Sequence, residues 1–162
     1  MVKSGLIIGA ISFVLVLGFS VLVTPFCAPC LGLVFGIIAG YLAGVFDKPS
    51  NSGESVRKGG TAGAIAGAIG FVGGMVGGVI NGALLNPASV ESFTKVFGIN
   101  NFSISQAEIW TYQLVFALCV GLFNVVWMAI LGVAGGALWY QIRGKNQTTM
   151  VLPPQTPIPP SI

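Results

Sequence analysis

The chain alternates between long apolar stretches and short polar ones. Apolar residues dominate the ranges 5–24, 28–46, 60–85 and 106–142. A helix needs about 20 such residues to cross a hydrocarbon core of about 30 Å, and each range reaches or approaches that length. The pattern therefore predicts an all-α, polytopic membrane protein with four transmembrane helices over these ranges.

The polar stretches predict the connections. Residues 47–59 are dense in loop-forming residues and predict a loop between the second and third helices. In the predicted outer loop, 86–105, Val90, Phe93 and Phe97 have helical spacing, which indicates a short interfacial helix. Ser105 and Glu108 have the spacing of a capping box, which predicts the start of the fourth helix. We expect a transmembrane domain over 1–145 and a proline-rich, disordered tail over 146–162.

Composition supports a membrane location and excludes several kinds of chemistry. Hydrophobic residues make up 54% of the chain and charged residues 7%, whereas a soluble domain carries roughly 25% charged residues. The chain has no His and only three Cys, so imidazole catalysis is absent and we expect no metal site and no cofactor. The few basic residues are scattered, so we expect no nucleic-acid partner.

The basic residues predict an orientation in the membrane. With the N-terminus in the cytoplasm, six of them fall on the inner side and Lys95 alone falls outside; the six are Lys3, Lys48, Arg57, Lys58, Arg143 and Lys145. Cytoplasmic loops of membrane proteins carry an excess of Lys and Arg. We therefore expect a multi-pass cell-membrane protein with both termini in the cytoplasm (N-in/C-in).

Glycines recur every three or four residues on the second and third predicted helices. The second carries Gly32, Gly36, Gly40 and Gly44, and the third carries Gly63, Gly67, Gly70, Gly74, Gly78 and Gly82. Such glycine ladders let helix backbones approach closely in lipid. They predict an antiparallel hairpin of these two helices, with one glycine surface left for another chain or, alternatively, packing within one chain alone. Asn124 predicts an interhelical hydrogen bond.

One motif suggests reactivity. Cys27 and Cys30 form a CxxC in the first outer turn, at the start of a helix whose dipole lowers thiol pKa values. The layout resembles membrane thiol oxidoreductases, but those enzymes use a second external Cys pair, and here Cys119 lies inside the fourth helix. A redox pair, a structural disulfide or inert thiols are the alternatives.

The first 85 residues resemble a known kind of protein more closely. A Cys-rich turn, then residues 36–44 (GIIAGYLAG), a polar loop and residues 59–67 (GGTAGAIAG) are similar to small glycine-rich four-helix prokaryotic membrane proteins of unknown function. The resemblance implies fold and location and no activity. We expect a non-catalytic protein that acts through helix packing in the lipid bilayer, by self-association or as an accessory subunit of another membrane protein. The alternatives are an outward-facing thiol-disulfide redox protein using Cys27 and Cys30, and a small channel.

Overall fold

The computed structural model describes residues 1–22, 28–99 and 103–145, with the backbone alone described for 20–22 and 28–31. These residues form α1 (Val2–Leu22), α2 (Ala28–Asp47), α3 (Ser52–Leu84), α4 (Pro87–Val96) and α5 (Gln106–Trp139), which ends in the π-helical turn η2 (Tyr140–Gly144). The described ranges contain no strand. The predicted all-α class is confirmed.

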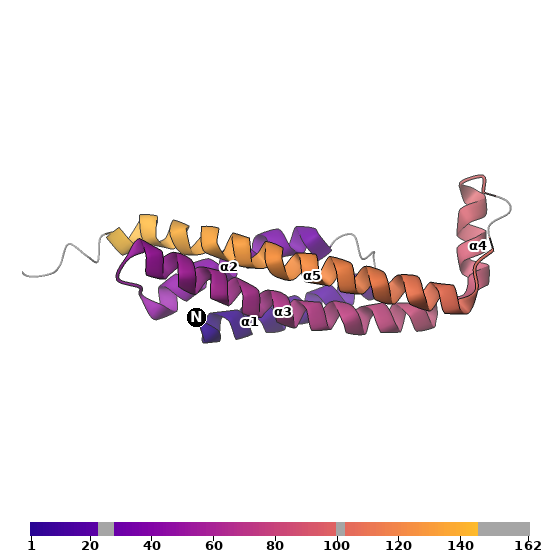
Figure 1. Ribbon diagram of the computed structural model, residues 1–162, viewed down its shortest axis with the longest axis horizontal. Helices are drawn as coiled ribbons and strands as arrows, with labels where there is room; N and C mark the ends of the chain where they lie inside the picture. The colour runs from indigo at the N-terminus through magenta and orange to yellow at the C-terminus, as the bar shows by residue number, and fades with distance from the viewer. Residues whose placement is uncertain (23–27, 100–102, 146–162) are drawn as a thin grey trace, which may run out of the picture.

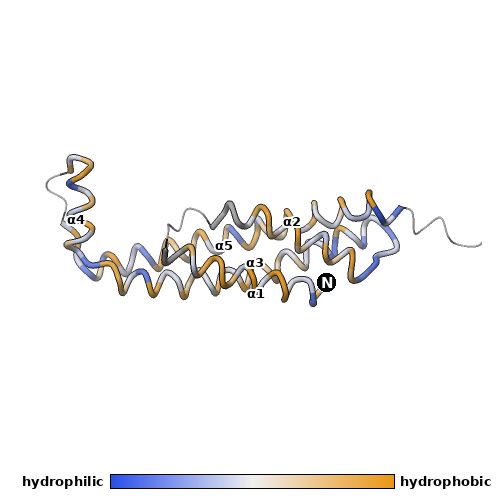
Figure 2. Tube along the Cα trace, turned by 180° about the vertical axis from the view of Figure 1, so that it is seen from behind, coloured by the Kyte–Doolittle hydropathy of each residue, from blue (hydrophilic) through white to orange (hydrophobic). Residues whose placement is uncertain are grey.

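Four long helices run side by side, and α4 stands across one end of the bundle (Figure 1). The two longest, α3 and α5, pack along each other; α1 packs on α3, and α2 packs mainly on α5 and also on α3. Hydrophobic residues follow the length of the helices, and hydrophilic ones gather towards the ends, including the turn between α2 and α3 (Figure 2).

Three helices are long and apolar enough to cross a membrane: α1 over Val2–Phe19, α3, and α5 continued to Gly144. The described part of α2 adds a shorter apolar helix, Gly32–Asp47. In lipid every backbone N–H and C=O must bond within the protein, so a glycine-rich segment such as α3 still becomes helical. The structure is thus compatible with membrane insertion.

The predicted loop between the second and third helices is wrong for most of its length, because α3 begins at Ser52. The Asn51 side chain caps the helix by accepting a 2.8 Å hydrogen bond from the Glu54 amide. One turn later, Lys58 pairs with the Glu54 carboxylate at 2.7 Å, in the favourable i,i+4 order. These local interactions make a polar stretch helical although its composition is typical of a loop.

The predicted start of the fourth helix is confirmed, and a short helix forms before it, within the range where one is predicted. The helix α4 begins after the cap Asn86, with Pro87 in its first turn. The helix α5 begins with the predicted capping box: Ser105 accepts from the Glu108 amide, and the Glu108 carboxylate accepts from the Ser105 amide at 2.8 Å. Short-range spacing alone was sufficient to locate the start of α5.

Candidate functional site

The glycine ladder of α2 packs against α5. A Cβ atom built on Gly36 would lie 2.8 Å from Leu131 Cβ, and one on Gly40 would lie 2.7 Å from the carbonyl carbon of Gly132. A Cβ on Gly44 would meet the Trp139 side chain. The expectation that this ladder lies directly on the ladder of α3 is therefore wrong, although α2 and α3 are neighbours.

The first half of α3 packs on another side of α5. Cβ atoms on Gly59, Gly63 and Gly67 would lie 3.0 Å or less from backbone atoms of α5. The α5 glycines Gly132 and Gly136 meet α3, and Gly135 meets α2. The helix α5 thus packs closely against both predicted ladders, because its own small residues let each of the two helices approach its backbone.

The helix α1 supplies a third close contact, with α3. Cβ atoms on Gly5 and Gly9 would lie 2.9 Å from Ile65 Cβ and 3.3 Å from Ala66 Cα, and one on Gly73 would lie 2.9 Å from the Phe13 carbonyl oxygen. Sequence analysis missed the glycines of α1 and α5. The four-residue spacing of Gly5 and Gly9, and of Gly132 and Gly136, is the signal that could have found them.

Four polar side chains are buried among the described residues, Ser4, Ser12, Ser55 and Asn124, and the last two lie at contacts with α5. Ser55, fully buried, donates a 2.7 Å hydrogen bond to the carbonyl oxygen of Gly136 and so links α3 to α5. Asn124 is buried at the α2–α5 contact, where its oxygen lies against the position that a Cβ on Gly32 would occupy. Its amide nitrogen donates to Met128 Sδ on the same helix, and its oxygen has no hydrogen-bond partner among the described residues. The interhelical hydrogen bond predicted for Asn124 is thus not found within the described residues.

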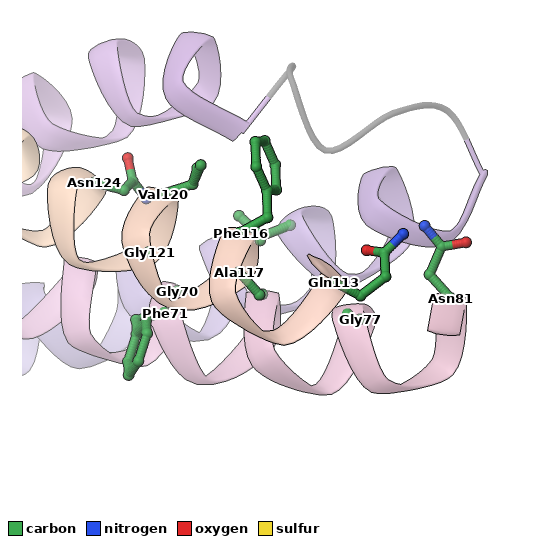
Figure 3. Close-up of a pocket in the computed structure, with 13 residues that line it drawn as sticks. Gly70, Phe71, Gly77, Asn81, Gln113, Phe116, Ala117, Val120, Gly121 and Asn124 are labelled. Carbon is green, nitrogen blue, oxygen red and sulfur yellow. The ribbon is translucent and has the colours of Figure 1, made fainter. Parts of the chain in front are cut away.

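Two glycines in the second half of α3, Gly70 and Gly74, are packed more loosely and border a groove. Cβ atoms on Gly70 and Gly74 would find their nearest described neighbours, on α1, at 3.7 Å, whereas those on Gly78 and Gly82 would lie 3.2 Å from α5. The described lining of this glycine groove comes from α1, α3 and α5 (Figure 3): Val16, Gly70, Phe71, Gly74, Gly77, Gly78, Asn81, Gln113, Phe116, Ala117, Val120, Gly121 and Asn124.

Side-chain amides lie at both ends of the glycine groove. Asn81 and Gln113, on facing helices, lie beside each other at one end, and Asn124 lies at the other (Figure 3). Asn81 and Gln113 are half-buried, and the described residues give neither side chain a hydrogen-bond partner. Such groups cannot bond to lipid tails, so a hydrogen-bonding partner inside the groove would stabilise them.

The predicted cysteine site lies largely outside the described residues. Cys27 falls in the range 23–27, and for Cys30 the backbone alone, in the first turn of α2, is described. Cys119 is a free, exposed thiol on α5. In the described part of the chain, no group of acidic and cysteine residues could hold a metal ion.

The charged groups lie towards the ends of the bundle. At the end formed by the α2–α3 turn, Asp47 pairs with the amino group of Met1, and Lys58 pairs with Glu54. At the other end, Glu108 belongs to the capping box of α5. Three of the four carboxylates of the chain therefore stabilise helix ends or join helices.

In comparisons with known proteins, no family model, no curated protein and no solved structure matches the chain.

Proposed function

We propose that the chain is a non-catalytic integral membrane protein that acts through helix packing, and that the glycine groove is its association surface. The occupant would be a transmembrane helix, from a second copy of the chain or from another membrane protein that it serves as an accessory subunit. The observation that carries the proposal is the presence of side-chain amides at both ends of a groove lined largely by small and apolar residues.

Small residues and amides together suit a helix better than they suit lipid. Glycine and alanine let a partner backbone approach closely, and an Asn or Gln side chain can hydrogen-bond across the contact, typically for about 0.6 kcal/mol. Other glycines are already covered within the chain, namely those of the α2–α5 and α1–α3 contacts and those in the first half of α3 that meet α5. The partly exposed Gly74, whose Cβ would find its nearest described neighbour at 3.7 Å, is therefore the ladder position best suited to a partner.

The arrangement also supports the proposed N-in/C-in orientation. Figure 1 places the N-terminus, the α2–α3 turn and the end of α5 towards the same end of the bundle. Of the six basic residues expected inside, one lies near the N-terminus, three lie in or near the α2–α3 turn and two lie at the end of α5. Lys95 lies on α4, at the opposite end of the bundle. On α3, Lys58 and Asn81 are 23 residues apart, about 35 Å at 1.5 Å per residue, close to the hydrocarbon thickness of about 30 Å.

A leucine at position 74 provides the test. A Cβ on Gly74 has ordinary contact distances within the chain, so Gly74→Leu fills the groove while sparing the closest helix contacts. Gly18→Leu is the matched control, since no described atom lies within 4 Å of a Cβ at that position, outside the groove. Gly78→Leu is less suitable because its Cβ would already lie 3.2 Å from Ala117 Cβ.

The measurement is the mass of the complex in mild detergent after extraction from the native membrane. We expect the wild type and Gly18→Leu to co-purify with a second copy or another membrane protein, and Gly74→Leu to lose it with unchanged helix content. A wild type that extracts as a single chain, or a Gly74→Leu variant that keeps its partner, would overturn the proposal.

The thiol-disulfide and channel hypotheses remain predictions from the sequence. Labelling Cys27 and Cys30 in whole cells with an impermeant maleimide, with and without reductant, tests the first. Conductance of the protein in liposomes tests the second.

A further inference from the structure

A second cavity lies beneath α4, between the end of α3 and the start of α5. Its volume is about 360 Å³, within the range of roughly 300–1,000 Å³ usual for small-molecule sites. We call it the α4 chamber; its described lining is Leu85, Val90, Ile104, Ile109, Tyr112, Gln113 and Phe116. Five of these side chains carry no polar atom.

The helix α4 leaves an apolar surface uncovered above this chamber. It stands across the bundle axis (Figure 1), and none of its residues is buried. Val90 lines the chamber, and Phe93 and Phe97 continue its stripe at helical spacing with their ring centroids 5.0 Å apart. Phe93 and Phe97 are 64% and 67% exposed, so the described residues leave most of this stripe uncovered.

Helix lengths place the chamber at a definite depth. From Lys58 to Leu84 the axis of α3 rises about 39 Å, and a bilayer with its headgroups is about 40–45 Å thick. With Lys58 at one headgroup region, α4 lies at the other and runs along the membrane surface. The chamber then lies just below those headgroups, where lipid acyl chains begin.

We propose that the α4 chamber binds one acyl chain of a phospholipid from the leaflet in which α4 lies. The chain fills the space between Val90 on α4 and Ile104 and Ile109 at the start of α5. The headgroup stays at the level of α4, where exposed Lys95 lies at the depth of the lipid phosphates. The proposal requires that the protein spans a bilayer and does not depend on a partner in the glycine groove.

Size and chemistry favour an acyl chain over other occupants. Water needs two to four polar partners, and of the described lining side chains only Tyr112 and Gln113 carry polar atoms, so most of the wall gives water no side-chain hydrogen bond. A flexible hydrocarbon chain can follow the shape of this mostly apolar chamber.

The test uses the full chain in phosphatidylcholine vesicles that contain a phosphatidylcholine with a photoreactive diazirine in one acyl chain. After irradiation, mass spectrometry maps the lipid adducts on the protein. Val90→Trp fills the chamber from α4, which packs little against the rest of the protein, and Ile104→Trp fills it from the opposite wall. Val96→Trp is the matched control, because Val96 lies on the same helix, is 81% exposed and does not line the chamber.

We expect adducts at the chamber wall in excess over the lipid-facing Val126 of α5, and one phospholipid retained in native mass spectrometry. Val90→Trp and Ile104→Trp should each lower both signals by about tenfold, a change of about 1.4 kcal/mol in binding, and Val96→Trp should leave them unchanged. Equal adduct yields at the chamber and at Val126 would overturn the proposal, and so would crosslinks to a second protein chain in place of lipid. Adducts absent everywhere, Val126 included, would overturn membrane insertion as well.

Discussion

Replacing Gly40 by alanine tests the closest contact between α2 and α5. A Cβ at this position would lie 2.7 Å from the carbonyl carbon and 2.8 Å from the Cα of Gly132, and closer still to its carbonyl oxygen. All three are backbone atoms, so no side-chain rotation can relieve the overlap. Because ordinary contacts begin at 3.4 Å, α2 and α5 must separate by at least 0.7 Å, the difference between 3.4 and 2.7 Å.

The magnitude follows from two opposing effects. A gap of about 0.5–1 Å forfeits a quarter to a half of each dispersion contact, and overpacking a close contact typically costs about 1–3 kcal/mol. Alanine also favours the helix over glycine by about 1 kcal/mol. Since the overlap is with rigid backbone, we take the upper end of the cost. Gly40→Ala should therefore lower the free energy of unfolding by about 2 kcal/mol.

Unfolding in mixed detergent micelles, followed by the fluorescence of Trp139 and the other tryptophans, gives this free energy. Gly18→Ala is the control, because no described atom would contact its Cβ; it should be neutral or slightly stabilising. If Gly40→Ala unfolds at the same detergent composition as Gly18→Ala, the close α2–α5 contact does not exist as described.

Three further predictions concern single side chains and orientation. Ser55→Ala removes the buried 2.7 Å hydrogen bond to α5 and should lower the free energy of unfolding by about 0.6 kcal/mol in the same assay. An unchanged free energy of unfolding would contradict this hydrogen bond. Ser105→Ala removes the cap of α5 and should cost about 1 kcal/mol, seen as amide exchange about fivefold faster in the first turn of α5 and unchanged in α3. In a chain without its native cysteines, Ser103→Cys should react with an impermeant maleimide added to whole cells, and Gly53→Cys should react after lysis alone; the reverse pattern would refute N-in/C-in.

Helix starts were predictable from capping residues in the sequence, but the prediction used this signal for α5 and not for α3. The capping box at Ser105 fixed the start of α5 because its two hydrogen bonds depend on neighbours three residues apart. The same kind of signal stood at Asn51 and in the Glu54–Lys58 pair, but composition outweighed it and the start of α3 was placed too late.

The partners of the glycines could not be predicted in the same way. Spacing shows which glycines share one side of a helix, but a residue without a side chain carries no information about the neighbour it meets. The three-dimensional arrangement decides this, and it places α5, with Gly132, Gly135 and Gly136, against both α2 and α3. The glycine groove exists because the contacts with α5 use Gly59, Gly63 and Gly67 and leave Gly70 and Gly74 loosely packed.

Photocrosslinking from the groove in native membranes tests the central proposal most directly. A photoreactive amino acid at Val120, in the wall of the groove, should give one discrete crosslinked protein product. The same amino acid at Val126, which is exposed on α5 and does not line the groove, should give none. Equal crosslinking from the two positions, or adducts with lipid alone from Val120, would contradict the proposal that a partner helix occupies the groove.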